Sequence, residues 1–156
     1  MNIFDRLIEA VKFYDVSVEV KEDELTIVSR ANDNRISVYE EAYYNKELTI
    51  RYVAYTVCFS TQHRHFDYLD DVEEYVLAIL QDNVLPIEFY KEDARCFGGE
   101  ISIEEYHSLT PVMLTEKYGY CIDYLSQYEY EIHSWSGNYD IERKRVSDLS
   151  NSSKRQ

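Results

Sequence analysis

Glycine and proline are scarce in this chain, whose 156 residues include four glycines and two prolines. Glycine-rich phosphate-binding loops need several closely spaced glycines, so they are nearly excluded, as are collagen-like and linker sequences. Cysteine is also rare, and Cys58, Cys96 and Cys121 lack the spacing of a metal site. Because Cys58 and Cys121 have apolar neighbours, we expect them to be buried thiols in a protein of the reducing cytoplasm.

Long apolar runs are absent as well. Charges at Asp5, Arg6 and Glu9 interrupt the N-terminal segment, which argues against a signal peptide. The best apolar run, residues 53–60, has the length of a strand and falls well short of the roughly 18 uncharged residues of a membrane span. We therefore expect no membrane-spanning segment.

Positive charge is in short supply, since 16 basic residues stand against 30 acidic ones and the net charge is −14 at pH 7. Free nucleic acid and anionic membrane surfaces are therefore disfavoured as partners. Apolar residues make up 45% of the chain, which excludes a wholly disordered protein. The length predicts a single globular domain over residues 1–146, followed by a disordered polar tail over residues 147–156.

Two segments have the apolar periodicity of amphipathic helices. In residues 3–13 the apolar side chains recur at i, i+3 and i+4, and Asn2 precedes them as the expected N-cap. Residues 68–81 carry a similar apolar stripe, and Asp70 and Glu73 at the start of that segment have the spacing of a capping box. Each stripe is narrow, so each helix should cover a sheet rather than be enclosed.

Other segments favour strands. These runs are residues 16–20, 25–29, 35–39, 48–60, 87–90, 118–125, 128–133 and 139–146. Short turns join the first four, which predicts an antiparallel meander, because parallel pairing needs crossovers of a dozen or more residues. The last two flank the turn at residues 136–138 and predict a hairpin. Between the predicted strands 87–90 and 118–125, Gly98-Gly99 predicts a turn, and the capping-box spacing of Ser102 and Glu105 predicts a short helix to about residue 109.

Together these elements predict an α+β fold. Its sheet should be mainly antiparallel, made of a four-strand meander plus a C-terminal hairpin, with two or three helices packed on one face. The helices and the sheet would then share one core.

The start of the second helix is acidic. Asp70, Asp71 and Glu74 lie opposite the apolar stripe and should face solvent, and Asp67 precedes them. One interpretation is a patch that docks a basic protein and steers its approach. The other is stabilisation of the helix dipole, with a solvated outer face. The overall charge favours docking, because capping needs only one or two carboxylates.

Tyrosine is abundant, with 16 residues against six phenylalanines and one tryptophan. Tyrosine suits half-exposed positions, where the ring meets a partner and the hydroxyl finds a hydrogen bond. Tyrosine beside carboxylates is suited to binding Arg and Lys, which makes the C-terminal hairpin a candidate contact surface. Its candidate residues are Tyr128, Glu129, Tyr130, Glu131 and Trp135, and the further candidate tyrosines are Tyr39, Tyr43, Tyr44, Tyr124 and Tyr139. Half-exposed sheet positions also favour tyrosine without any partner, so both interpretations stay open.

His63 and His65 form the one cluster that resembles a metal site. Residues two apart on a strand share a face, so both rings could reach one Zn²⁺. The third ligand would be Asp67, His107 or His133. Neighbouring histidines at a strand end are usually just exposed, and we assign no metal and no cofactor.

Nucleophilic catalysis has little support. Arg95 could lower the pKa of the Cys96 thiol, and His107 or His133 could serve as its base. Nothing in the sequence brings these groups together, and the motifs of α/β-hydrolases, P-loop proteins and zinc proteases are absent. We assign no catalytic residue.

In size, acidity, aromatic richness and lack of catalytic motifs, the chain is similar in profile to the small acidic immunity proteins that bacteria make beside their own secreted toxins. This profile implies a non-enzymatic inhibitor that neutralises a basic partner such as a nuclease toxin, whose phosphate-binding surface is positive. One alternative is a small metal-dependent hydrolase that uses the His63/His65 region. Another is a structural or regulatory domain whose acidity only keeps it soluble. An uncovered tyrosine-rich sheet face could also form a homodimer.

Overall fold

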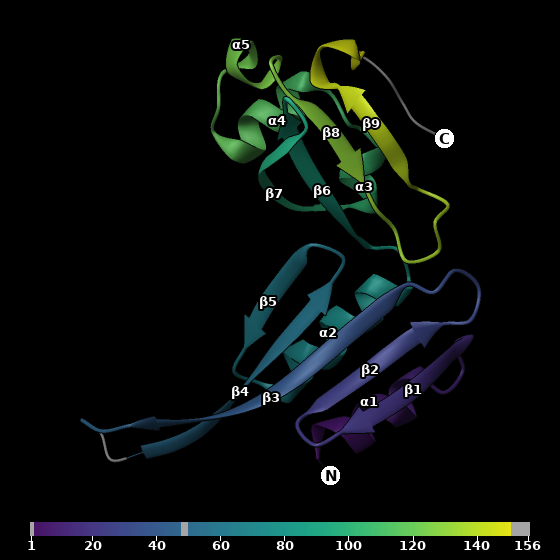
Figure 1. Ribbon diagram of the computed structural model, residues 1–156, viewed down its shortest axis with the longest axis vertical. Helices are drawn as coiled ribbons and strands as arrows, with labels where there is room; N and C mark the ends of the chain where they lie inside the picture. Colours follow the sequence, from purple (N-terminus) through teal and green to yellow (C-terminus); the bar gives the residue numbers. More distant parts are fainter. Residues whose placement is uncertain (1, 48–49, 151–156) are drawn as a thin grey trace. The chain divides into compact units, whose positions relative to one another are not determined.

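The computed structural model describes residues 2–47 and 50–150, and the chain divides into two compact units, Met1–Gln81 and Asp82–Gln156. Each unit has its own antiparallel sheet and its own buried residues, where the length predicts a single domain. Within the described residues, the sheets have five and four strands, and five α-helices accompany them (Figure 1). The α+β class with antiparallel pairing is therefore confirmed.

The sheet of the N-terminal unit is an up-and-down meander. In spatial order its strands are β1 (Val16–Lys21), β2 (Glu24–Ser29), β3 (Arg35–Asn45), β4 (Ile50–Phe59) and β5 (Gln62–Phe66). The predicted strand 48–60 is β4, and residues 48 and 49 lie outside the described residues. The meander has a fifth strand in addition to the four predicted. The sequence does not predict β5 because it has no apolar alternation, and β5 forms by pairing with β4.

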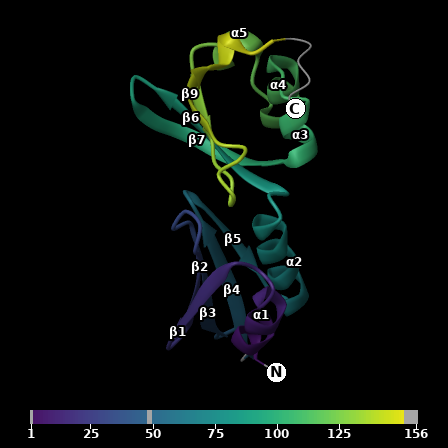
Figure 2. The ribbon, with the colours of Figure 1, turned by 90° about the vertical axis from the view of Figure 1, so that its right-hand side faces the viewer.

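Helices α1 (Ile3–Val11) and α2 (Leu69–Leu80) cover one face of this sheet (Figure 2). Their apolar stripes are buried, as the periodicity predicts, and Leu7 and Val76 are fully enclosed. Burial of such a stripe supplies most of the stability of a short helix, since helices of this length are marginal alone.

The two helices begin differently. Asn2 caps α1, because its side chain accepts a hydrogen bond of 2.8 Å from the backbone N–H of Asp5, as predicted. The predicted capping box of α2 is wrong. Tyr68 stands at the N-cap position and makes no side-chain cap bond, and Asp70 lies inside the first turn, where it forms an ion pair with Arg6 of α1.

Strand alternation separates the two faces of this sheet. The side chains beneath the helices form the core of the unit and include Leu25, Ile27, Ile36, Val38, Val57 and Phe59. The opposite face, here called the open face, is polar and has no helix of its own unit over it (Figure 2). Its residues include Glu19, Lys21, Glu24, Thr26, Ser37, Tyr39, Thr56, Cys58, His63 and His65.

The C-terminal unit has a sheet in the order β7-β6-β8-β9, with every neighbouring pair antiparallel. Its strands are β6 (Val84–Lys91), β7 (Ala94–Ser102), β8 (Glu129–Ile132) and β9 (Ile141–Arg145). Its helices are α3 (Ile103–His107), α4 (Pro111–Tyr118) and α5 (Ile122–Leu125), and a 3-10 turn follows at Val146–Asp148. The core joins sheet residues such as Ile87 to helix residues such as Leu114.

Several predictions for this unit are confirmed. The hairpin forms from β8 and β9, and the strand predicted at residues 87–90 is part of β6. The capping box of α3 is present, with the Ser102 hydroxyl accepting from the Glu105 backbone and the Glu105 carboxylate accepting from the Ser102 backbone. These features rest on local spacing, which the sequence displays directly.

Three predictions are wrong. Gly98-Gly99 is not a turn but part of β7, where the missing side chain of Gly98 leaves room for the carboxylate of Glu88. Residues 118–125 form no strand, because Gly119 at φ 72° ends α4 and α5 follows. The disordered tail expected from residue 147 is wrong for its first three residues, since the 3-10 turn includes residues 147 and 148 and Leu149 is buried, while residues 151–156 lie outside the described residues.

Candidate functional site

A row of polar side chains crosses the open face of the N-terminal unit. In the strand register, Lys21 stands opposite Glu24, Glu24 opposite Tyr39, Tyr39 opposite Thr56 and Thr56 opposite His65. Directly opposed residues on antiparallel strands have Cβ atoms about 4.5–5.5 Å apart, so each residue of the row is the cross-strand neighbour of the next. The row therefore forms one continuous strip over five strands.

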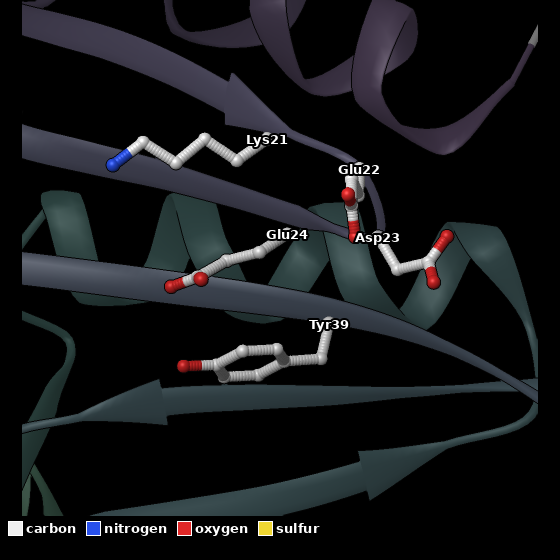
Figure 3. Close-up of a pocket in the computed structure, with 5 residues that line it drawn as sticks. All are labelled: Lys21, Glu22, Asp23, Glu24 and Tyr39. Carbon is white, nitrogen blue, oxygen red and sulfur yellow. The ribbon is translucent and has the colours of Figure 1, made fainter.

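A pocket of about 610 Å³ lies at one end of this strip (Figure 3). It is lined by Lys21, Glu22, Asp23, Glu24 and Tyr39. The side chains of Lys21, Glu24 and Tyr39 run in the same direction along the open face, and Glu22 and Asp23 extend from the turn between β1 and β2. This turn is tight, because Lys21 already pairs with Glu24 and Glu22 adopts a φ of 45°.

Tyr39 and Glu24 are coupled across β2 and β3. Partial burial, which is the larger cause, and a hydrogen bond to the Glu24 carboxylate raise the pKa of the Tyr39 hydroxyl above its ordinary value. The Thr26 hydroxyl also donates to Glu24, at 3.3 Å. The carboxylate and the phenol ring are thus held side by side, and we call this arrangement the Glu24–Tyr39 pair.

The pocket is negative, and within residues 2–47 and 50–150 no cation is paired with its carboxylates. Its lining has three carboxylates, from Glu22, Asp23 and Glu24, against the one ammonium of Lys21. None of these four groups forms an ion pair with another described residue. Carboxylates beside an aromatic face attract a cation from outside through charge and cation–π contact.

The other end of the strip holds the two histidines. The rings of His63 and His65 are 5.3 Å apart, so they share a face as the spacing predicts. The His65 Nδ1 atom lies 2.9 Å from the Thr56 hydroxyl. No group of three metal-ligating side chains occurs within residues 2–47 and 50–150, and His107 and His133 belong to the other unit.

The three cysteines lie in different environments. Cys58 is half-buried opposite His63, and burial together with the charge of Glu24 raises the pKa of its thiol, which favours the unreactive protonated form. Cys121 is exposed, so the expectation of a buried thiol is wrong there. Cys96 is exposed too, and its thiol lies 3.3 Å from the Ala94 carbonyl oxygen.

The predicted acidic patch on α2 is exposed. Asp67, Asp70, Asp71 and Glu74 all lie on the surface, as the helical periodicity predicts. Asp70 is engaged within the chain, because it pairs with Arg6, which also pairs with Glu73 on the same helix. Asp67, Asp71 and Glu74 thus remain as candidate contact residues of this patch.

The aromatic residues of the predicted hairpin surface are buried instead of half-exposed. Tyr130 is 1% exposed, Tyr128 6% and Trp135 7%, and the two tyrosines belong to the core of the C-terminal unit. The Tyr128 hydroxyl donates to the Tyr124 hydroxyl at 2.7 Å, which satisfies its polar group internally. The expectation fails because tyrosine can be buried at little cost when a neighbouring hydroxyl accepts its hydrogen bond.

The acidic residues of the hairpin are partly buried and face a cation of their own chain. Arg143 on β9 donates from Nε to a Glu131 carboxylate oxygen at 3.2 Å, and its Nε lies 3.9 Å from a Glu129 oxygen. Its guanidinium also pairs with Asp93 at 3.0 Å and lies 3.6 Å from the centre of the Tyr90 ring. These carboxylates are less available to a partner than those of the pocket.

Of the remaining candidate tyrosines, Tyr43 and Tyr124 are exposed, Tyr39 and Tyr139 are half-buried, and the side chain of Tyr44 lies outside the described residues. The sequence does not predict the pocket residues of the β1–β2 turn as a site. In sequence, the run Lys21–Glu24 indicates only a turn. The strand register is what places Tyr39 beside Glu24.

Comparisons with protein families, with characterised proteins and with solved structures find no match to this chain. In the part of the chain that the structure describes, no helix is long and apolar enough to cross a membrane.

Proposed function

We propose that the protein is a non-enzymatic binding protein whose open face docks a basic protein. The observation that carries the proposal is the pocket beside the Glu24–Tyr39 pair, with three carboxylates, a phenol ring and no cation of the described chain paired to it. In this proposal the protein acts as an inhibitor of the immunity type, and its partner is a basic protein such as a nuclease toxin.

The physical basis is complementary charge over a preformed surface. A net charge of −14 attracts a basic protein from a distance and raises the rate of encounter. Once the partner arrives, the open face offers a rigid surface, because its five strands are fixed from behind by α1 and α2. A nuclease blocked in this way would lose access to its substrate phosphates.

The test compares two variants that remove equal charge. In the first, Asp23→Asn and Glu24→Gln neutralise two carboxylates of the pocket. In the second, Asp71→Asn and Glu74→Gln neutralise two exposed carboxylates of α2 that make no ion pair with a described residue. The substitutions are isosteric, so circular dichroism spectra should match the unsubstituted chain. Each tagged chain is used to capture proteins from lysate of the organism whose genome encodes it, at low and moderate salt.

We expect a basic protein to be captured near one-to-one by the unsubstituted chain and by the α2 variant, and to be lost with the pocket variant. Salt should weaken the capture, since screening acts on exposed charges. Loss with the α2 variant alone would move the contact surface to α2. Capture of no basic protein at either salt would refute the proposal and favour acidity that serves solubility only.

A further inference from the structure

The C-terminal unit contains an arrangement like the Glu24–Tyr39 pair, with an arginine bound to it. Tyr90 on β6 hydrogen-bonds with Glu131 on the neighbouring strand β8, and burial, the larger cause, together with this carboxylate raises the pKa of the Tyr90 hydroxyl. The guanidinium of Arg143 lies over the Tyr90 ring, 3.6 Å from its centre, while its Nε donates to Glu131 at 3.2 Å. One arginine thus contacts the ring face and the carboxylate together.

The Glu24–Tyr39 pair repeats the first half of this arrangement. Again a tyrosine and a glutamate lie on neighbouring antiparallel strands, and again the hydroxyl is hydrogen-bonded to the carboxylate. The difference is the cation. Among the described residues, no arginine or lysine lies over the Tyr39 ring or forms an ion pair with Glu24.

Arginine suits this arrangement better than lysine. A guanidinium is planar, so it can stack on a phenol ring and present N–H donors to a carboxylate at the ring edge at the same time. An ammonium is a compact, strongly hydrated charge and gains less from the ring. The chain itself illustrates the point, because Lys21 stands directly opposite Glu24 and still forms no ion pair with it.

We infer that the pocket receives an arginine side chain of the partner, with its guanidinium stacked on Tyr39 and paired with Glu24. Glu22 and Asp23 line the same pocket and add negative potential around the guanidinium. Lys21 opposes the incoming charge. This inference rests on the proposed function, since it specifies which basic side chain the open face recognises.

The test uses two capped peptides of equal charge, one of six arginines and one of six lysines, titrated into the full chain in moderate salt. Binding is measured by calorimetry and by NMR shifts of the Tyr39 ring. We expect the arginine peptide to bind about three- to fivefold more tightly than the lysine peptide, as a stacked guanidinium at an exposed site implies. Lys21→Gln should tighten the binding of both peptides.

Substitutions of Tyr39 test whether its ring causes the preference for the arginine peptide. Tyr39→Leu should abolish it while leaving the affinity for the lysine peptide nearly unchanged. Tyr39→Phe keeps the ring face and should retain the preference. Tyr43→Leu, which removes an exposed tyrosine further along the same strand, is the matched control and should also retain it.

Equal affinities for the two peptides would overturn the inference, and so would an arginine preference that persists in Tyr39→Leu. If the affinities are equal but Glu24→Gln weakens both peptides, the arginine inference fails while the proposed basic partner stands. If Glu24→Gln together with Asp23→Asn leaves both affinities unchanged, the inference and the proposed docking surface fail together.

Discussion

Gly98 is a position where the addition of one methyl group should destabilise the protein. A Cβ atom at this position would lie 2.6 Å from one carboxylate oxygen of Glu88 and 2.7 Å from its Cδ. Glu88 is fully buried, and its carboxylate is ion-paired with Arg95 on the neighbouring strand β7. For Gly98→Ala to reach an ordinary contact of 3.4 Å, the carboxylate must retreat by 3.4 − 2.6 = 0.8 Å.

The cost follows from what that displacement breaks. Overpacking alone costs about 1–3 kcal/mol. Separating a buried charge from its partner costs about 3–5 kcal/mol when both groups are buried. Arg95 is 48% exposed and can follow the carboxylate, so a fraction of that second cost applies. Alanine regains about 0.5–1 kcal/mol over glycine in a strand. We therefore expect Gly98→Ala to lower the free energy of unfolding by about 2 kcal/mol.

Urea unfolding followed by tryptophan fluorescence measures this loss. Trp135 is the one tryptophan of the chain, lies within the C-terminal unit and is 7% exposed, so its emission changes when unfolding exposes the ring to water. The matched control is Gly98→Ala combined with Glu88→Ala, where the new methyl group meets no carboxylate. In that background the substitution should be neutral or stabilising. A loss of the same size in both backgrounds would refute the steric argument.

Two further substitutions should have smaller effects on stability than Gly98→Ala. Arg143→Ala removes the ion pairs and the ring contact of Arg143 and should lower the free energy of unfolding by about 1–2 kcal/mol in the same assay. The control is Lys144→Ala at the exposed neighbouring position, which should change that free energy by no more than about 0.5 kcal/mol. Equal losses in the two variants would contradict the role given to Arg143. Burial opposes ionisation of Glu105, but hydrogen bonds from the Ser102 backbone and the Lys117 ammonium outweigh it and hold the pKa of Glu105 below its ordinary value of 4.5. The stabilisation is therefore present at neutral pH and lost as the pH falls through the folded-state pKa, so Lys117→Ala should destabilise by about 0.5 kcal/mol at pH 7 and by nothing near pH 2. A loss independent of pH would contradict it.

The elements that the sequence predicts best are those with local signals. The periodicity of α1 and α2, the cap at Asn2 and the box at Ser102 each involve residues within one or two helical turns. Each of these signals lies within one short stretch of sequence and agrees with the packing that buries the helix, so local preference and tertiary structure point to the same element. The alternation of β2 and β3 predicts strands in the same way, because one face of each is buried, whereas in β1 Val16 is buried and Val20 is 49% exposed.

The errors occur where a distant neighbour decides the local structure. β5 is a strand because β4 supplies its hydrogen bonds, and its polar sequence carries no strand signal of its own. Gly98 and Gly99 continue β7 because Glu88 and Tyr118 occupy the space that side chains would fill. A glycine pair is ambiguous in sequence, since it permits a turn and equally permits close approach of another group.

The abundance of tyrosine predicts a contact surface but not its position. Tyr128 and Tyr130 look suited to an interface, yet the first satisfies its hydroxyl with Tyr124 and both are buried. Nothing in the sequence distinguishes Tyr39 from these two tyrosines. Its role depends on register, because only the pairing of β2 with β3 places it opposite Glu24.

The fold also determines which acidic residues are paired with arginines of their own unit and which are not. Arg6 and Arg143 each neutralise carboxylates of their own unit, including residues of the two surfaces that the sequence favours for docking. The pocket of the open face differs, because its carboxylates have no described cation paired to them and adjoin the ring of Tyr39. A convex helix end can attract a basic protein, but its charges are screened by water on every side. A hollow beside a half-buried ring excludes part of that water, so the same carboxylates act on a bound guanidinium more strongly there.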